Sequence, residues 1–188
     1  PVMPEGAEEG IRKGMYLLQQ NDEHKLKAQL LGSGTILREA IGAAELLKEF
    51  GVSADIWSVT SFNELRKEGA FVERWNLLHP TEVPKQSYVG QCLDYTKGPV
   101  IAVTDYVAEY ANQIRRFTTK PYFALGTDGY GRSDTREQLR EFFEVNSRYV
   151  ALAALNQLAE AGQIEKAVVA EAIEKFNINP DKPNPVTV

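Results

Sequence analysis

The chain has few of the residues that mark disulfide-rich or metal-binding proteins. Its 188 residues include one cysteine and two histidines. The single cysteine, Cys92, excludes an internal disulfide framework and is typical of a reducing compartment, so we expect a cytoplasmic protein. His79 has no second histidine, cysteine or carboxylate at ligand spacing, and His24 lies in a turn-like segment, so we expect neither to bind a metal.

Positive charge and long apolar runs are also scarce. The net charge is −5 and no basic run exceeds the pair Arg115–Arg116, which argues against a nucleic-acid surface. No apolar run approaches the roughly 20 residues of a membrane span, and the first residues lack the charged and apolar regions of a signal peptide. The composition therefore predicts a globular domain without a nucleic-acid or membrane partner.

The two ends differ from the middle in composition. Residues 1–10, PVMPEGAEEG, hold two prolines, two glycines and three glutamates, which is typical of a linker between domains. The last residues are rich in proline and predict an extended tail at 180–188. We therefore expect a linker remnant at 1–10 and a folded domain at 11–179, cut from a longer polypeptide.

The most informative stretch is residues 123–143, FALGTDGYGRSDTREQLREFF. An apolar strand breaks into a loop with three glycines, and a helix begins again behind Ser133 or Asp134. In open α/β sheets, ligands bind at the carboxyl ends of strands, against such helix starts. The same pattern also describes an ordinary tight turn, with Glu137 in capping-box range of Asp134.

Charged side chains in this loop suggest a contact of some kind. Arg132 and Arg136 could hold a phosphate near the helix start, or pair with charges on neighbouring domains. The candidate anion or interdomain contact consists of Thr127, Asp128, Arg132, Ser133, Asp134 and Arg136.

The rest of the chain alternates between strand and helix patterns. Residues 10–20 and 25–31 predict a β-hairpin. An apolar stripe over 36–50 predicts an amphipathic helix, capped by Ser33 or Thr35. Further strands are predicted at 54–59, 100–103 and 122–125, and further helices at 60–78, 87–93, 104–116, 146–161 and 164–176.

This order of elements predicts an α/β fold. Helices that connect strands make neighbouring strands parallel, whereas the first hairpin adds an antiparallel edge. We expect a three-layer α/β/α sandwich around a five-stranded mixed, mostly parallel sheet whose first strand is antiparallel. A Gly32-x-Gly34 loop before a helix, with Asp55 about 20 residues on, also invites a dinucleotide-binding interpretation. Close packing of the helix on the sheet explains those glycines as well.

Several long runs resemble a known family. They are MPEGAEEGIRKG (3–14), QLLGSGTILREA (29–40), SVTSFNELRKEG (58–69), ERWNLLHP (73–80), LGTDGYGRSDTREQLREFFEV (125–145) and KAVVAEAIEKFNIN (166–179). Together they resemble the C-terminal domain, of the transketolase C-terminal type, of homodimeric bacterial pyruvate dehydrogenase E1 components. The resemblance covers nearly the whole chain.

The resemblance implies a role within a larger enzyme. In that family the N-terminal and middle domains bind thiamine diphosphate and Mg²⁺ and carry the catalytic groups. The enzyme decarboxylates pyruvate and acetylates a lipoyl group on the E2 component. The expected partners are the N-terminal and middle domains of the same subunit, a second E1 subunit and the E2 lipoyl acetyltransferase complex.

The resemblance transfers no catalytic residue to this chain. The thiamine diphosphate motif begins Gly-Asp-Gly, whereas Gly126-Thr127-Asp128-Gly129 interrupts that pattern. Asn156 lies at the right distance for the asparagine of the motif, but inside an apolar helix. We expect no cofactor, metal or catalytic residue here. The alternative is a regulatory module that binds an anion, nucleotide or acyl-CoA at residues 126–136.

Overall fold

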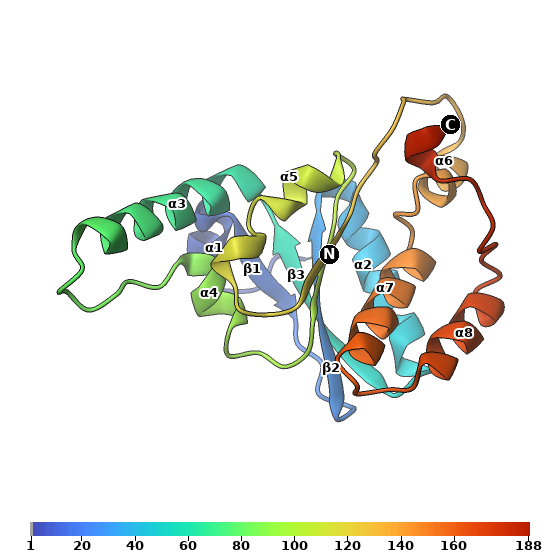
Figure 1. The fold of residues 1–188 in the computed structure, drawn as a ribbon, viewed down its shortest axis with the longest axis horizontal. Coiled ribbons are helices and arrows are strands. Elements are labelled where there is room, and N and C mark those ends of the chain that lie inside the picture. Colours follow the sequence, from blue (N-terminus) through green and yellow to red (C-terminus); the bar gives the residue numbers. More distant parts are fainter. Residues whose placement is uncertain (1) are drawn as a thin grey trace.

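The computed structural model describes residues 2–188, and a five-stranded sheet lies at its centre (Figure 1). The strands are β1 Met15–Gln19, β2 Leu26–Ser33, β3 Val52–Val59, β4 Val100–Val103 and β5 Tyr122–Leu125. The α-helices are α1 Glu8–Lys13, α2 Leu37–Lys48, α3 Phe62–Leu78, α4 Tyr88–Leu93, α5 Ala108–Asn112, α6 Arg136–Phe142, α7 Ser147–Glu160 and α8 Lys166–Lys175. Three short 3₁₀ turns are η1 Gly34–Ile36, η2 Arg115–Phe117 and η3 Pro185–Thr187.

The sheet has the order β1-β3-β2-β4-β5. β1 pairs with β3 antiparallel, and the remaining neighbours are parallel. All eight residues of β3 are buried, as an interior strand requires, whereas β1 becomes progressively exposed at the sheet edge. The predicted mixed sheet with its first strand antiparallel is confirmed.

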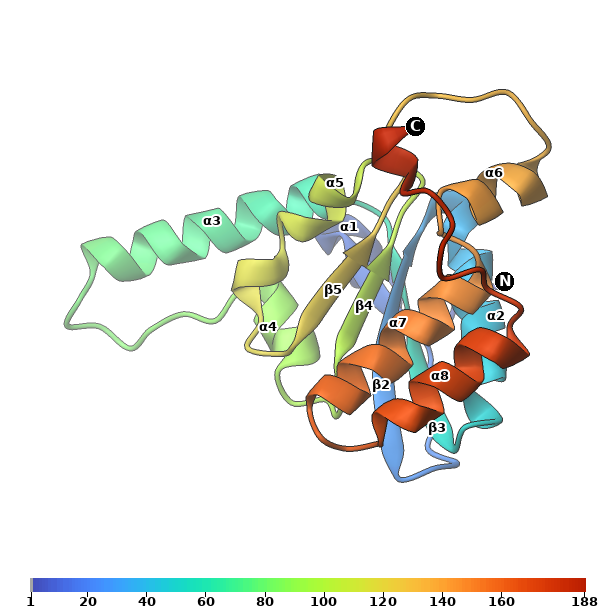
Figure 2. The same ribbon diagram turned by 45° about the vertical axis from the view of Figure 1, so that its right-hand side comes forward.

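Helices cover both faces of the sheet, which confirms the three layers. On one face α2, α7 and α8 form a hydrophobic core that includes Ala40, Leu47 and Leu155 (Figure 2). On the other face a second core includes Phe62 and Ile114. The apolar stripe of residues 36–50 faces the first core as predicted, because its members recur at helical spacing.

The predicted hairpin is wrong in its pairing. β1 and β2 form as expected but do not touch as neighbours, because β3 lies between them. Met15 pairs with Val59, and Leu26 pairs with Val52. Six of the eight residues of β2 are buried, which suits an interior position better than an edge hairpin.

The predicted helix start at Thr104 or Asp105 is also wrong. The Thr104 hydroxyl accepts the backbone N–H of Tyr106 at 3.2 Å and forms a turn. Val107 is extended, with φ −57° and ψ 144°, so α5 begins at Ala108. Tyr106 and Val107 are consequently exposed, at 63% and 50%, instead of packing in a helix face.

Helix caps were predicted with mixed success. The Asn146 side chain caps α7 by accepting the backbone N–H groups of Arg148 and Tyr149, as expected. No side chain caps the start of α2, so the expected cap at Ser33 or Thr35 is wrong. Ser33 instead donates its hydroxyl to Thr104 at 3.0 Å.

The two termini contain some regular structure. α1 begins at Glu8, inside the stretch expected to be linker, and η3 lies inside the stretch expected to be extended. The domain limits at residues 11 and 179 stay a prediction. No helix within residues 2–188 is long and apolar enough to cross a membrane.

Candidate functional site

A cleft of 510 Å³ lies where strands β2, β4 and β5 end. Its apolar lining comes from Ile36, Leu139, Phe143 and Val145, and its polar lining comes from Thr35, Asp105, Thr127, Arg132, Asp134, Arg136 and Arg140. β2 and β4 are neighbours from which the chain continues toward opposite edges of the sheet. The carboxyl ends of such strands are the usual place for ligands in open α/β sheets. The cleft is therefore the first candidate site of the fold.

The start of the loop is locked to the turn after β4. A Cβ on Gly126 would lie 2.2 Å from the backbone nitrogen of Ala108, so only glycine fits there. Thr127 donates its hydroxyl to the carbonyl of Asp105 at 2.9 Å. The Asp128 carboxylate accepts the backbone N–H of Ala108 at 3.1 Å and thereby serves the exposed N-terminus of α5. Thr127 and Asp128 hold the loop in place.

The helix after the loop, α6, begins one or two residues later than the predicted start behind Ser133 or Asp134. Thr135, and not Ser133 or Asp134, caps α6 by accepting the backbone N–H of Gln138 at 3.3 Å. Asp134 accepts the N–H of Thr135 at 2.6 Å, and Ser133 is exposed outside the cleft lining. The predicted capping box with Glu137 is therefore wrong, because the capping residue is the next threonine.

Three guanidinium groups surround the cleft. Arg132 lies over the ring of Phe142, 4.6 Å from its centroid. Arg136 begins α6 and lines the cleft. Arg140, which the sequence did not single out, pairs with Glu39 of α2 at 2.7 Å, and both side chains are only 16% exposed. This ion pair joins α6 to the helix across the cleft.

Two of these arginines keep their charge available. Within residues 2–188, neither Arg132 nor Arg136 forms an ion pair. A guanidinium can bind a carboxylate or phosphate with two parallel hydrogen bonds. Asp105 and Asp134 also line the cleft and reduce its positive charge. The arrangement can hold an anionic group beside an apolar wall, and it offers complementary charges for a protein surface.

The residues that faintly match a thiamine diphosphate motif do not form a site. The Asp128 carboxylate already accepts the backbone N–H of Ala108 at the N-terminus of α5. Asn156 is exposed on α7, where its amide lies 3.5 Å from Glu160 of the same helix. Within residues 2–188 there is no group of three or more His, Cys, Asp or Glu side chains that could hold a metal. These residues therefore do not fit the cofactor or its Mg²⁺.

The dinucleotide interpretation of Gly32 and Gly34 fails as well. A Cβ on Gly32 would lie 2.7 Å from Cα of Leu37, so close packing of the helix explains this glycine. Asp55 is buried and accepts hydrogen bonds from Lys27, Gln29 and the backbone of Asn21. Its carboxylate is not free to bind a ribose.

Cys92 and His79 show no catalytic arrangement. Burial raises the pKa of the Cys92 thiol, which opposes formation of the reactive thiolate. The ring of His79 stacks on that of Trp75, with centroids 4.4 Å apart, and its Nδ1 lies 2.8 Å from the Trp75 carbonyl oxygen. The expected loop position of His79 directly after α3 is confirmed.

Comparisons with known proteins agree with the fold. The family described as Transketolase-like TK C-terminal domain matches residues 14–146. The chain is 60% identical over 189 residues to the pyruvate dehydrogenase E1 component of Pseudomonas aeruginosa, covering 99% of this chain and 21% of that protein. It is 54% identical over 187 residues to the Escherichia coli (strain K12) protein of the same name, and the match covers 98% of this chain and 21% of that protein.

Solved structures of transketolases contain a domain with the same fold, at low sequence identity. The transketolase from Leishmania mexicana has a TM-score of 0.57 at 17% identity, covering 81% of this chain and 19% of that chain. The transketolase from Campylobacter jejuni has a TM-score of 0.53 at 21% identity, and the match covers 78% of this chain and 19% of that chain. The chain thus spans about a fifth of the length of the relatives it matches.

Proposed function

This chain belongs to the family of transketolase-like TK C-terminal domains, and from that premise we propose that it is the C-terminal assembly domain of a pyruvate dehydrogenase E1 subunit. The observation that carries the proposal is the 60% identity to a pyruvate dehydrogenase E1 component over 99% of the chain. That match spans 21% of the relative, so the rest of the subunit would lie outside this domain.

The whole subunit would carry out a thiamine-diphosphate-dependent reaction in the cytoplasm. It would decarboxylate pyruvate and transfer the acetyl group to a lipoyl group of an E2 component. Thiamine diphosphate with Mg²⁺ would supply the chemistry from the N-terminal and middle domains. A second E1 subunit would complete a homodimer. The residues of this chain would supply assembly surfaces and no reacting group.

The cleft would form one of those surfaces. Within residues 2–188, Arg132 and Arg136 form no ion pair. Arg132 and Asp134 lie on the loop that Gly126 and Asp128 hold against the body, and Arg136 begins α6. Such a rigid, mixed-charge edge suits contact with carboxylates and cations of a neighbouring domain. We expect Arg136→Glu in the full subunit to weaken assembly, measured by sedimentation. Lys166→Glu, an exposed change on α8, is the matched control, and equal assembly of both variants would disprove this contact.

Two measurements test the proposed function. Calorimetric titration of this chain with thiamine diphosphate and Mg²⁺ should give no saturable heat. The longer polypeptide that contains the chain should release CO₂ from pyruvate when the cofactor is present. Saturable binding to the chain alone, or a longer polypeptide without pyruvate turnover, would contradict the proposal.

A second candidate is a regulatory site for an anion, nucleotide or acyl-CoA. The observation in its favour is that the guanidinium groups of Arg132 and Arg136 lie beside an apolar wall in the 510 Å³ cleft. Titration with ATP and acetyl-CoA tests it directly. Binding that is lost in Arg132→Ala/Arg136→Ala would favour this function, whereas unchanged affinity in that variant would exclude the cleft as the site.

A further inference from the structure

The helix α3 carries the chain away from the body of the domain. In Figures 1 and 2 its C-terminal half projects beyond the sheet, and the following segment returns to α4. We call residues 70–87 the arm. Val72 is the last buried residue of α3, and the next buried residue of the chain is Ser87. The outer part of the arm therefore receives little support from the domain core.

The tip of the arm is nevertheless built to be stiff. The Asn76 amide donates to the carbonyl of Lys85 at 2.9 Å and accepts the N–H of Lys85 at 2.8 Å. The Lys85 ammonium lies 3.9 Å from the centroid of the Trp75 ring, which also stacks on His79. These contacts tie the returning segment to the last turns of α3. A helix end without such ties would fray, because short isolated helices are marginal in water.

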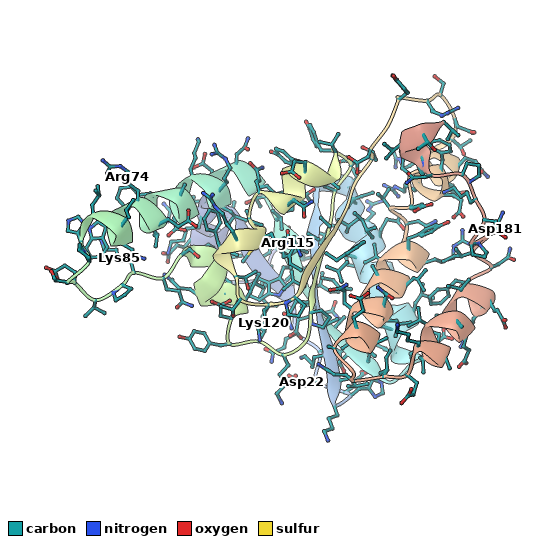
Figure 3. The ribbon with its side chains drawn as sticks, viewed as in Figure 1. Asp22, Arg74, Lys85, Arg115, Lys120 and Asp181 are labelled. Atoms are coloured by element: carbon teal, nitrogen blue, oxygen red, sulfur yellow. The ribbon has the colours of Figure 1, made fainter. Side chains whose placement is uncertain are left out.

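This stiff arm exposes large apolar side chains. Phe71 is 61% exposed, Leu77 77%, Leu78 54% and Val83 84%. Phe71 and Leu78 are seven residues apart and share a helix face, with Trp75 between them. In Figure 3, Arg74 lies on α3 within the arm, and Lys85 lies on the returning segment beside that helix. Clusters of exposed apolar side chains on a rigid element mark interaction surfaces.

We propose that the arm docks on an apolar face of the part of the subunit polypeptide that lies outside this domain. The inference rests on the proposed function. Relatives with the same sequence pattern are about five times as long as this chain, since it covers 21% of them. A surface buried by those additional residues would be exposed in this structure. Docking would cover Leu77, Leu78 and Val83, and would explain why the tip is reinforced.

Amide hydrogen exchange in the full-length subunit tests this docking. The amide groups of Thr81 and Val83 find no hydrogen-bond acceptor within residues 2–188, so they should exchange at the unprotected rate unless something covers the arm. We expect the amides of Thr81 and Val83 to exchange at least tenfold more slowly than the unprotected rate in the full-length subunit. The double variant Leu77→Gln/Val83→Gln should restore fast exchange. The control Tyr95→Gln, at an 83% exposed position off the arm, should not.

Each outcome decides the inference. Unprotected exchange of the Thr81 and Val83 amides in the wild-type subunit overturns it. Protection that disappears when the subunits are separated by dilution assigns the contact to a second copy and also overturns it. Protection at all concentrations, lost only in the double variant, supports it. A subunit with a protected arm but no pyruvate turnover would disprove the proposed function and leave the docking standing.

Discussion

The ammonium group of Lys182 lies 2.7 Å from the carbonyl oxygen of Phe142, the last residue of α6. It also donates to the carbonyl of Glu141 at 2.8 Å and pairs with the Glu144 carboxylate at 3.2 Å. Glu144 has φ +61°, a left-handed conformation that is rare for a residue with a side chain. The C-terminal tail thus satisfies the exposed carbonyls of α6, a helix with no buried residue.

Lys182→Met should therefore loosen α6 more than its surroundings. The variant removes a cation from a helix C-terminus, where it binds two carbonyls, and we expect a loss of about 1–3 kcal/mol in the free energy of unfolding. Urea unfolding measures the global loss, and hydrogen exchange of 136–143 measures the local one. Lys166→Met on α8 is the control, since Lys166 is exposed and binds no carboxylate within residues 2–188. Equal effects of both variants would show that the tail does not hold α6.

The pair Arg140–Glu39 predicts an unequal cost for its two partners. Glu39 accepts hydrogen bonds from Arg140 and, at 2.8 Å each, from the amide and hydroxyl of Ser147. Arg140→Ala removes one of these donors, whereas Glu39→Ala leaves all three without their acceptor. We expect the free energy of unfolding to fall by about 1–2 kcal/mol in Arg140→Ala and by roughly 2–4 kcal/mol in Glu39→Ala. Urea unfolding measures both losses. A larger loss of stability in Arg140→Ala than in Glu39→Ala would refute this prediction.

How much of the fold was predictable depends on how local the deciding contacts are. The helix over 60–78, observed as α3, and the strand over 100–103 follow from neighbouring residues, and both were predicted. The place of β1 beside β3 depends on which strands fill the middle of the sheet, which no local pattern encodes.

The candidate site shows the same division. The loop, its glycines and Arg132 and Arg136 at the cleft were predicted from one contiguous stretch. Arg140 was missed because its partner Glu39 lies 101 residues away. Asp128 was among the predicted site residues. Its hydrogen bond with the backbone N–H of Ala108 could not be predicted, because that contact depends on how β4 and β5 align.

A buried ion pair in the sheet offers a further prediction. Lys27 and Asp55 lie 2.8 Å apart, with side chains 7% and 9% exposed. Lys27→Met leaves the Asp55 carboxylate buried with fewer hydrogen-bond donors. It should therefore lower the free energy of unfolding by about 3–5 kcal/mol. The double variant Lys27→Met/Asp55→Leu should recover part of that loss, since it buries no unpaired charge. Thermal unfolding compares the two, and a double variant less stable than Lys27→Met would contradict this reasoning.

Asp94 should make part of the stability depend on pH. Burial alone would raise the pKa of Asp94, but hydrogen bonds from the Thr119 backbone and from the side chains of Thr118, Gln86 and Thr119 outweigh it and hold the pKa below its usual value. A carboxyl whose pKa is lower in the folded state stabilises the protein above its unfolded-state pKa, near 4, and loses that effect as the pH falls through the folded value.

Asp94→Asn should therefore lower the free energy of unfolding by about 1–2 kcal/mol at pH 7, since a charged acceptor of several hydrogen bonds is lost. The difference from the wild type should stay constant down to about pH 5 and shrink below about pH 4, where the carboxyl of the unfolded chain binds a proton while the native carboxylate still resists protonation. Urea unfolding from pH 7 to pH 3 measures both curves. Asp181→Asn, at an exposed tail position, should follow the wild type throughout. A gap that widens toward acid would mean that the folded-state pKa of Asp94 is raised, and that burial outweighs the hydrogen bonds from Thr118 and Thr119.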